Sequence, residues 1–163
     1  MYNLRLARLR VGKANTGNGV FAYEPIKKGT LIVLMRGRIM STEAVEAAID
    51  AGNIRADDPF QIIEDTFIKL NKLPYLFNHS CEPNAGFKQG RNMVALHDIQ
   101  KGEEIRYDYS SVVCTHCAWS MQCKCGCSRC RKKVGNASTI PKKSLEEYTK
   151  LGVLPKFIQK EIL

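Results

Sequence analysis

A dense run of cysteines lies in the last third of the chain and has the spacing of a metal site. Cys123, Cys125 and Cys130 form the pattern Cys-x-Cys-x4-Cys, and Gly126 between them lets the backbone turn tightly. Zinc in structural sites takes four ligands in a tetrahedron, with thiolate sulfurs at about 2.3 Å. One segment supplies three ligands, and Cys81, isolated in an Asn-His-Ser-Cys turn, is the natural candidate for the fourth. The sequence therefore predicts a zinc ion that fixes the C-terminal segment onto the middle of the chain.

The remaining cysteines leave alternatives open. Cys114 and Cys117 form a Cys-x-x-Cys pair, which could begin a second metal site with His116 and Cys127 or act as a thiol redox pair. Six of the seven cysteines fall between Cys114 and Cys130, and the first residues of the chain lack the apolar stretch of a secretion signal. Because cytosolic thiols are kept reduced, we expect metal binding rather than disulfides. We predict that Cys114, Cys117 and Cys127 are surplus thiols.

Three further motifs could act together with the cysteines. Residues 78–84 read Asn-His-Ser-Cys-x-Pro-Asn, residues 102–109 read Gly-Glu-Glu-Ile-x-Tyr-Asp-Tyr, and residues 16–22 read Thr-Gly-Asn-Gly-Val-Phe-Ala. Taken singly, they are typical of a capped turn, a strand whose tyrosines pack, and a hairpin turn. Taken in this order with the cysteine pattern, they resemble the SET-domain lysine methyltransferases that carry a post-SET zinc segment. The resemblance covers roughly residues 4 to 131.

The resemblance implies a mainly β fold, in the β-rich α+β class. Small curved sheets surround a pseudoknot, in which the C-terminal segment passes beneath a preceding loop. The chain then divides into a SET domain at residues 4–111, a post-SET zinc-binding segment at 112–131 and a C-terminal tail at 132–163. In the tail we predict helical patches interrupted by Gly152 and Pro155.

The resemblance also implies a binding site for the methyl donor S-adenosylmethionine. Gly17, Asn18 and Gly19 would form the first cofactor-binding loop, where glycine lets the backbone approach a ligand closely. Asn78 and His79 would hold the cofactor through side-chain and backbone hydrogen bonds.

By the same resemblance, two tyrosines carry the reaction. Tyr109 is the catalytic tyrosine, which orients the amine and contacts the transferring methyl group. Tyr107 occupies the neighbouring position, where a tyrosine crowds the amine and implies mainly mono- or dimethylation. Trp119 is assigned to the adenine side of the cofactor, with anchoring of the zinc segment as the alternative.

Methyl transfer to lysine explains why aromatic residues are needed. The attacking ε-amine must be neutral although its free pKa is near 10.4, so at neutral pH only about one amine in a thousand is ready. A channel of aromatic rings beside the positive sulfonium disfavours the ammonium form, both by desolvation and by repulsion between like charges.

Short apolar or alternating runs joined by glycine turns predict the elements that position these residues. A helix is predicted at Ser41–Asp50, because the segment opens with a hydroxyl cap and ends before Gly52. Turn residues are predicted at Gly12 and at 15–19. Strands are predicted at residues 4–11, 20–22, 30–35, 60–63, 66–70, 85–88, 92–96 and 105–109.

The composition bounds the class of protein. At 163 residues, 44% hydrophobic and 25% charged, the chain is expected to form one domain with appendages. It contains no run of the roughly 18 to 20 apolar residues that a membrane span needs, so we expect no membrane partner. The expected location is intracellular, nuclear in a eukaryote and cytoplasmic in a bacterium. The net charge of +9 favours an acidic partner, and nucleic acid stays open because the charges are spread along the chain.

The leading prediction is a protein-lysine N-methyltransferase whose partner is a lysine-containing protein tail, such as that of a histone. One alternative is a zinc-stabilised module of the same fold that binds histone tails or nucleic acid without catalysis. The presence of both Tyr107 and Tyr109 argues against that alternative. The other alternative is a thiol redox protein built on Cys114 and Cys117, which stoichiometric zinc and few free thiols would exclude.

Overall fold

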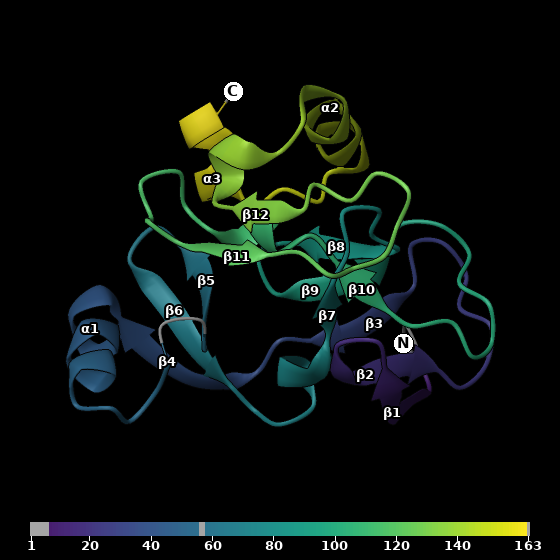
Figure 1. The fold of residues 1–163 in the computed structure, drawn as a ribbon, viewed down its shortest axis with the longest axis horizontal. Coiled ribbons are helices and arrows are strands. Elements are labelled where there is room, and N and C mark those ends of the chain that lie inside the picture. Colours follow the sequence, from purple (N-terminus) through teal and green to yellow (C-terminus); the bar gives the residue numbers. More distant parts are fainter. Residues whose placement is uncertain (1–6, 56–57, 163) are drawn as a thin grey trace, which may run out of the picture.

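The computed structural model of the chain describes residues 7–55 and 58–162. Within them, five sheets of two or three strands and a few short helices make up the fold. The sheet that contains β4 lies at one end of the molecule beside helix α1, the β1–β2 hairpin lies at the other end, and helices α2 and α3 cover a third side (Figure 1). The prediction of a mainly β fold built from small sheets is confirmed.

The N-terminal hairpin is longer than the sequence predicts. It consists of β1 (Leu9–Ala14) and β2 (Gly17–Ala22), and its register pairs Gly12 with Gly19. Of the turn residues predicted at Gly12 and at 15–19, residues 15 and 16 turn the chain, whereas the prediction is wrong for Gly12 and residues 17–19, because they pair inside the β1–β2 ladder. Residues 4–6 of the predicted first strand lie outside the described residues.

Two three-stranded antiparallel sheets form the body of the domain, with strand orders β3-β9-β8 and β4-β6-β5. The strands predicted at 60–63, 66–70, 85–88 and 92–96 are present within a residue or two. Strand β4 was not predicted, because Arg38 and Ile39 are both exposed and blur its alternation. The bounds are β3 (Leu31–Leu34), β4 (Gly37–Ser41), β5 (Pro59–Ile63), β6 (Thr66–Leu70), β8 (Ala85–Lys88) and β9 (Asn92–Ala95).

Helix α1 (Thr42–Asp50) follows β4 directly, as predicted. The Ser41 hydroxyl accepts a hydrogen bond of 3.3 Å from the Ala44 N–H, which satisfies one of the free donors at the helix start. Val45 is buried on the inner face of the helix, where it packs with Met40 and Ile54. The helix is thereby fixed against the β4-β6-β5 sheet.

Two very short strands lie side by side at the centre of the fold, where two distant segments of the chain meet. This pair of strands is called the central crossing below. They are β7 (Asn78–His79) and β10 (Arg106–Tyr107), and they pair in parallel. The Ser80 N–H donates to the Tyr107 carbonyl at 3.0 Å, and the Asn84 N–H donates to the Arg106 carbonyl at 3.2 Å. This parallel contact between distant segments is the juxtaposition that a pseudoknot requires.

The strand predicted at 105–109 ends early. The Asp108 carboxylate accepts from the Ser110 N–H at 3.0 Å and caps a short 3-10 helix, η2 (Tyr109–Val112). A carboxylate that caps a helical turn competes with continuation of the strand. The alternation of apolar and polar residues does not reveal such a cap. Tyr109 therefore begins a helical turn instead of continuing the strand.

The C-terminal third folds back over the β3-β9-β8 sheet. Gly152, with a φ of 63°, ends α2 in the left-handed region, and Pro155 precedes α3, so the predicted interruptions are confirmed. A side chain at Gly86 on β8 would lie 3.0 Å from Val153, which shows how closely the tail packs. The remaining elements are η1 (Pro74–Leu76), β11 (Ser120–Gln122), β12 (Lys133–Gly135), η3 (Ala137–Thr139), α2 (Lys142–Leu151) and α3 (Lys156–Ile162).

The main hydrophobic core lies between the hairpin, the β3-β9-β8 sheet and the central crossing. Its fully buried members include Phe77, Phe87, Met93 and Ile105. Among the described residues, no helix is long and apolar enough to cross a membrane.

Candidate functional site

The residues assigned to the cofactor come together beside the central crossing. The Asn78 side-chain amide donates to the Asn18 carbonyl at 3.0 Å and to the Glu104 carboxylate at 2.7 Å. The β1–β2 hairpin and strand β7 therefore meet through Asn78, although 60 residues separate Asn18 from Asn78. Glu104, which the sequence analysis did not single out, completes this contact.

The two glycines of the hairpin are needed for different reasons. A Cβ at Gly19 would lie 2.5 Å from the Glu104 carboxylate and 3.1 Å from the Asn78 amide, so protein atoms already fill that space. Gly17 has a φ of 112°, and a Cβ built there would meet no protein atom within 4 Å. The close approach at Gly19 is therefore to the chain itself, and the open side of the hairpin is at Gly17.

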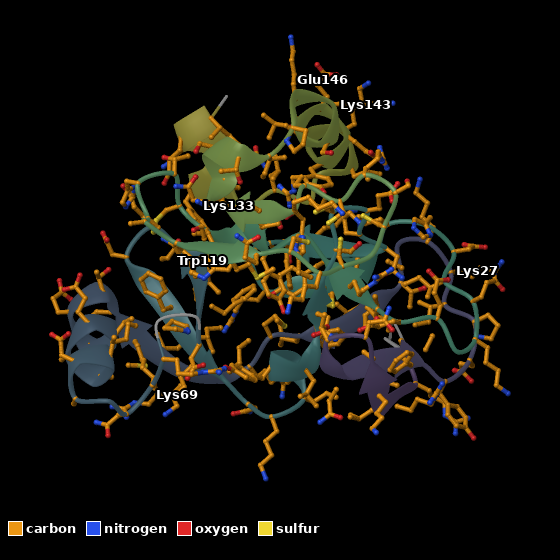
Figure 2. All side chains as sticks on the ribbon, in the orientation of Figure 1. Lys27, Lys69, Trp119, Lys133, Lys143 and Glu146 are labelled. Atoms are coloured by element: carbon orange, nitrogen blue, oxygen red, sulfur yellow. A yellow bond between two sulfur atoms is a disulfide. The ribbon has the colours of Figure 1, made fainter. Side chains whose placement is uncertain are left out.

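A second feature is a cavity of about 530 Å³ on the opposite flank of the crossing. Tyr107 and Tyr109 line its inner end, and their ring centroids lie 4.8 Å apart. Trp119 lines the same cavity, 6.3 Å from the Tyr109 ring, and lies between β11 and the β5–β6 strands (Figure 2). Trp119 is thus grouped with the tyrosines and not with Asn18 and Asn78.

Tyr109 connects the cavity to the crossing. Its hydroxyl donates to the Phe77 carbonyl at 2.7 Å, and its backbone N–H donates to His79 Nδ1 at 3.2 Å. Burial raises the pKa of the Tyr107 hydroxyl well above its usual value, with the neighbouring Tyr109 and Asp108 adding to the effect, so Tyr107 is a neutral phenol. The inner end of the cavity is therefore aromatic and carries no charge at Tyr107.

The rim of the cavity carries polar residues that the sequence analysis did not single out. Tyr75 donates its hydroxyl proton to Asp58 and accepts a hydrogen bond from Arg55, and all three residues line the cavity. Arg55 also lies 3.1 Å from Asp58 as an ion pair. No sequence pattern joins these residues, because Arg55 and Asp58 come from the loop before β5 and Tyr75 comes from η1.

Three of the four cysteines predicted to bind zinc, Cys81, Cys123 and Cys125, lie together with His79 around β7 and the loop between β11 and β12, with one ligand atom from each within 4.8 Å of the others. Cys130, the fourth, lies outside that group and contacts Cys123. The Cys81 and Cys123 sulfurs are 3.8 Å apart, which is the edge of a tetrahedron with zinc–sulfur bonds of about 2.3 Å. The Cys123 thiol contacts those of Cys125, Cys130 and Cys81; burial and these contacts raise its pKa above the usual value. Gly126, with a φ of 73°, makes the turn between them. The thiol cluster, as it is called below, consists of Cys81, Cys123, Cys125, Cys127 and Cys130.

His79 also contacts the thiol cluster, but it acts there as a hydrogen-bond donor and not as a metal ligand. Its Nε2 lies 3.2 Å from the Cys81 sulfur, while its Nδ1 accepts from the Tyr109 N–H. Burial lowers the pKa of His79 to about 3, with Arg131 and Arg106 adding to the effect, so the ring is neutral. A neutral imidazole that accepts at Nδ1 carries its proton on Nε2, where it has no lone pair for a metal. His79 therefore donates to the Cys81 sulfur.

Cys127 is the extra thiol of the cluster. Its sulfur lies 3.4 Å from that of Cys125 and also contacts Glu82. Burial, the Cys125 sulfur and Glu82 raise the pKa of Cys127 to about 12, whereas hydrogen bonds from the backbone of Cys81 and Cys127 outweigh burial and lower the pKa of Cys125 to about 6. Cys125 is thus the better thiolate of this neighbouring pair.

Arg131, Asp108 and Tyr148 link the thiol cluster to the tyrosines. Arg131 contacts the Cys81 sulfur through Nε at 3.3 Å and the Asp108 carboxylate through a terminal nitrogen at 2.5 Å. The Tyr148 hydroxyl on α2 donates to the other Asp108 oxygen at 3.2 Å. Burial raises the pKa of Asp108, and Arg131, the Ser110 N–H and Tyr148 each oppose that rise. The residue between the two tyrosines is therefore held from both the zinc segment and the tail.

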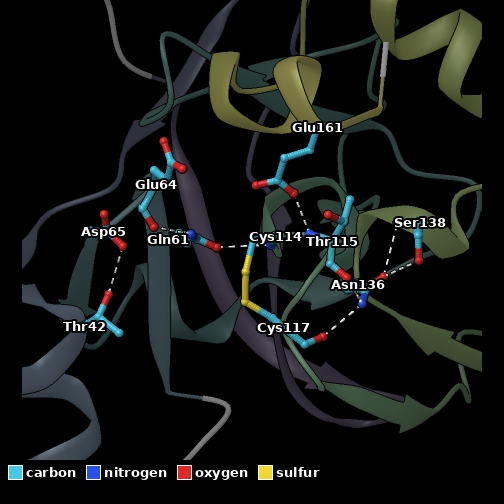
Figure 3. The surroundings of a disulfide bond; sticks show 10 residues. All are labelled: Thr42, Gln61, Glu64, Asp65, Cys114, Thr115, Cys117, Asn136, Ser138 and Glu161. Carbon is cyan, nitrogen blue, oxygen red and sulfur yellow. Dashed lines mark hydrogen bonds between the residues drawn. A yellow bond between two sulfur atoms is a disulfide. The ribbon is translucent and has the colours of Figure 1, made fainter.

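Cys114 and Cys117 differ from the expectation of surplus thiols, because the structure joins them in a disulfide (Figure 3). Cys127 is free, as expected, and so are the four predicted zinc ligands. The two cysteines are three positions apart in the sequence, and their Cα–Cα distance of 5.4 Å suits a disulfide. The expectation of free thiols rested on the reducing conditions of an intracellular compartment. Those conditions do not determine how close the local backbone brings two sulfurs.

Comparison with known proteins gives the family. A model of the SET domain matches residues 17–110. Over 145 residues the chain is 30% identical to histone-lysine N-methyltransferase ASHH3 of Arabidopsis thaliana, covering 80% of this chain and 39% of that protein. It is also 30% identical over 131 residues to histone-lysine N-methyltransferase 2B of Homo sapiens, covering 71% of this chain and 5% of that protein.

The fold comparison agrees. The crystal structure of the methyltransferase domain of human histone-lysine N-methyltransferase SETMAR aligns with a TM-score of 0.63 at 23% sequence identity, covering 80% of this chain and 58% of that chain. The chain spans about two fifths of the length of the Arabidopsis relative and far less of the human one. The family model nevertheless matches more than half of this chain, and it includes both the central crossing and the two tyrosines. The chain belongs to the SET-domain family.

Proposed function

We propose that the protein is an S-adenosylmethionine-dependent protein-lysine N-methyltransferase that adds mainly one or two methyl groups. The observation that carries the proposal is the position of Tyr109. Tyr109 lines the aromatic cavity, its hydroxyl donates to the Phe77 carbonyl, and its backbone N–H donates to His79, the residue next to Asn78. One residue thus connects a cavity suited to a lysine side chain with the residues assigned to the methyl donor.

The cavity has the chemistry that a lysine nucleophile needs. Tyr107, Tyr109 and Phe77 line it and withhold water from an entering amine, which favours its neutral form. The two hydroxyls can orient the nitrogen lone pair toward the methyl group, and a second polar hydroxyl beside the amine leaves little room for a third methyl group. S-adenosylmethionine would supply a methyl group on a positive sulfur, and Tyr109 would be the residue nearest the transfer.

The residues around Asn78 fit a cofactor of that kind. No protein atom lies within 4 Å of the position that a side chain at Gly17 would take, so a ligand can approach the backbone there. Asn78 is half-buried and Asn18 is exposed. The Asn78 amide nitrogen already donates to Asn18 and Glu104, so a cofactor there would meet the Asn78 side-chain oxygen. Gly17, Asn18, Gly19, Asn78 and His79 would hold the cofactor, and Trp119 would cover it or the substrate from the post-SET segment.

The thiol cluster fits zinc. We propose Cys81, Cys123, Cys125 and Cys130 as the ligands, because His79 offers a proton where a metal needs a lone pair and Cys127 faces Glu82. A zinc ion there would join β7 to the loop after β11. The segment boundaries at residues 111 and 131 follow from the same assignment, with the SET domain before it and the tail after it.

The substrate class that we propose is a lysine-containing protein segment. The names of the relatives point to histones, which would place the protein in a nucleus; a bacterial source would place it in the cytoplasm with another protein substrate. Lys27, Lys69, Lys133 and Lys143 lie on different sides of the molecule, so the positive charge forms no single patch at these residues (Figure 2). A protein substrate is favoured over nucleic acid because the relatives are named for methyl transfer to histone lysines.

The test is methyl transfer from labelled S-adenosylmethionine to a panel of histones and cell proteins, with the modified lysines located by mass spectrometry. We expect Tyr109→Phe to lower turnover by about 10²-fold, since it removes one positioned hydroxyl. Tyr23→Phe removes a hydroxyl from an exposed tyrosine outside the site and serves as the control. Equal turnover of the two variants would remove Tyr109 from the mechanism.

A second function, a binding module without catalysis, makes a different prediction. Such a module has no use for the methyl donor, so calorimetric titration with S-adenosylmethionine would give no heat of binding. Binding of the donor together with methylated lysine in the product excludes the module.

A further inference from the structure

The disulfide between Cys114 and Cys117 lies in the wall of the tyrosine cavity. Cys117 lines the cavity together with Trp119, whereas Cys114 is 1% exposed and packs in the core beneath the tail. The two sulfurs therefore differ in access. A small molecule that enters the cavity can reach the sulfur of Cys117 and cannot reach that of Cys114.

The loop that carries the pair is held by hydrogen bonds from three other elements. The Cys114 N–H donates to the Gln61 side chain on β5 at 3.1 Å, and the Thr115 N–H donates to the Glu161 carboxylate on α3 at 2.6 Å. The Asn136 amide donates to the carbonyls of Thr115 and Cys117 at 2.7 and 2.9 Å (Figure 3). None of these bonds involves sulfur, so the backbone would keep the two cysteines close when the disulfide is open.

A histidine stands beside the pair. One atom from each of Cys114, His116 and Cys117 forms a group in which all three lie within 4.8 Å of one another, and His116 itself is exposed. The pair therefore has an exposed imidazole as its neighbour on the solvent side.

We propose that Cys114 and Cys117 form a reversible thiol–disulfide exchange site for low-molecular-weight thiols and disulfides of the glutathione class. In oxidation, the Cys117 thiolate attacks a sulfur of the small disulfide, forms a mixed disulfide and releases one thiolate. The Cys114 thiolate then attacks the Cys117 sulfur and releases the second. The two protein thiols lose two electrons and two protons, and the small disulfide takes them up to become two thiols.

A reversible site reconciles the disulfide with an intracellular protein. Disulfides in reducing compartments are usually transient and are used for redox sensing or catalysis rather than for support. The thiol cluster would not compete for the exchange, because zinc would hold its thiolates.

The exchange acts on the segment that carries Trp119, two residues after Cys117. The closed disulfide fixes this segment to Cys114, and so to Gln61 on β5, across the cavity wall. Opening it removes the covalent link while the hydrogen bond from Asn136 to Cys117 remains, so the environment of the nearby Trp119 ring changes from a disulfide to two thiols. Trp119 is the single tryptophan of the sequence, so its fluorescence reports on this segment alone.

The same residues could instead hold a metal ion, because Cys114, His116 and Cys117 offer three ligands. That alternative needs both thiols reduced so that their sulfurs can bind the metal, which the closed disulfide excludes and the open form allows. It is one of the outcomes that the experiment separates.

The experiment equilibrates the full chain, with zinc present, in buffers of varied ratio of oxidised to reduced glutathione. After an acid quench, unfolding and alkylation, mass spectrometry examines the tryptic peptide of residues 107–124, which contains Cys114, Cys117 and Cys123. We expect one alkylated cysteine in oxidising buffer and three in reducing buffer, with a parallel and reversible change in Trp119 emission. Cys117→Ser, the matched variant with one oxygen in place of the accessible sulfur, should show neither change.

Three results would overturn the proposal. They are three alkylated cysteines at every glutathione ratio, an emission change that persists in Cys117→Ser, and a zinc content that is higher in the wild type than in Cys117→Ser by one ion per chain. None of these readouts uses methyl transfer, so the exchange site can fail while the proposed function stands, and the reverse also holds.

Discussion

The thiol cluster and the Cys114–Cys117 pair occupy neighbouring parts of one segment, yet their sulfurs meet different partners. In the cluster, Cys81 comes from the turn after β7, 42 residues before Cys123, and Arg131 and His79 both donate toward its sulfur. In the pair, both sulfurs come from one tight loop, and the hydrogen bonds that tie this loop to Gln61, Asn136 and Glu161 are made by its backbone groups and not by its sulfurs.

The difference indicates what determines whether a cysteine binds a metal or forms a disulfide. Thiolates that converge from distant segments carry excess negative charge, which donors and a metal ion can neutralise. Two thiols in one loop, with His116 as their neighbour, lie close enough to close a bond of their own. The cluster should therefore support the fold, while the pair should respond to redox conditions with little effect on stability.

The largest expected effect comes from removing a proposed zinc ligand. Cys130→Ser should lose the zinc and lower the free energy of unfolding by about 5 kcal/mol, because the binding energy of a structural zinc is folding energy. Cys127→Ser, three residues away in the same loop, should keep the zinc. Metal analysis and denaturant unfolding of the two variants measure the effect, and zinc loss from Cys127→Ser alone would reverse the assignment.

A smaller effect is expected at the cation that joins the cluster to Asp108. Arg131→Gln removes the charge that faces both the Cys81 sulfur and a carboxylate that is 2% exposed, and leaving that carboxylate unpaired should cost about 3 kcal/mol. Denaturant unfolding checks the value. Arg129→Gln removes a guanidinium from the exposed pair with Glu82 and should lower the free energy of unfolding far less, because solvent screens that pair. Similar losses in the two variants would show that Asp108 does not depend on Arg131.

The smallest effect is expected at the tail. Tyr148→Phe keeps the ring, which is 4% exposed, and deletes one hydrogen bond to Asp108, so it should cost about 1.5 kcal/mol. Because the SET-domain match ends at residue 110, this variant tests whether a residue outside it supports the segment between the two tyrosines. Unchanged unfolding together with unchanged methyl transfer would mean that the tail only covers the sheet.

The sequence predicts much of this molecule because its signals are local. Strands at 60–70 and 85–96, the Ser41 cap and the stop at Gly152 follow from alternation, hydroxyl capping and glycine conformation. The convergence of Cys81 with Cys123 also followed from zinc's need for four ligands. What local patterns could not reveal is the capping role of Asp108, which turns Tyr109 out of its strand.

Contacts made only by tertiary packing were also beyond the sequence. Glu104 beside Gly19, the Arg55–Tyr75–Asp58 group at the cavity rim and Tyr148 on Asp108 join segments that share no motif. The Cys114–Cys117 bond was missed for a different reason. The sequence analysis expected a reducing compartment and therefore expected free thiols. Whether Cys114 and Cys117 form a disulfide depends instead on the backbone geometry of one loop.

The most direct test follows zinc content and methyl transfer together while a chelator removes the metal and zinc is then returned, with a thiol reductant present so that Cys114 and Cys117 stay open throughout. If zinc in the thiol cluster holds the post-SET segment against Tyr109, transfer to lysine should fall in proportion to the zinc removed and recover when zinc is restored. Full methyl transfer by zinc-free protein would contradict the account.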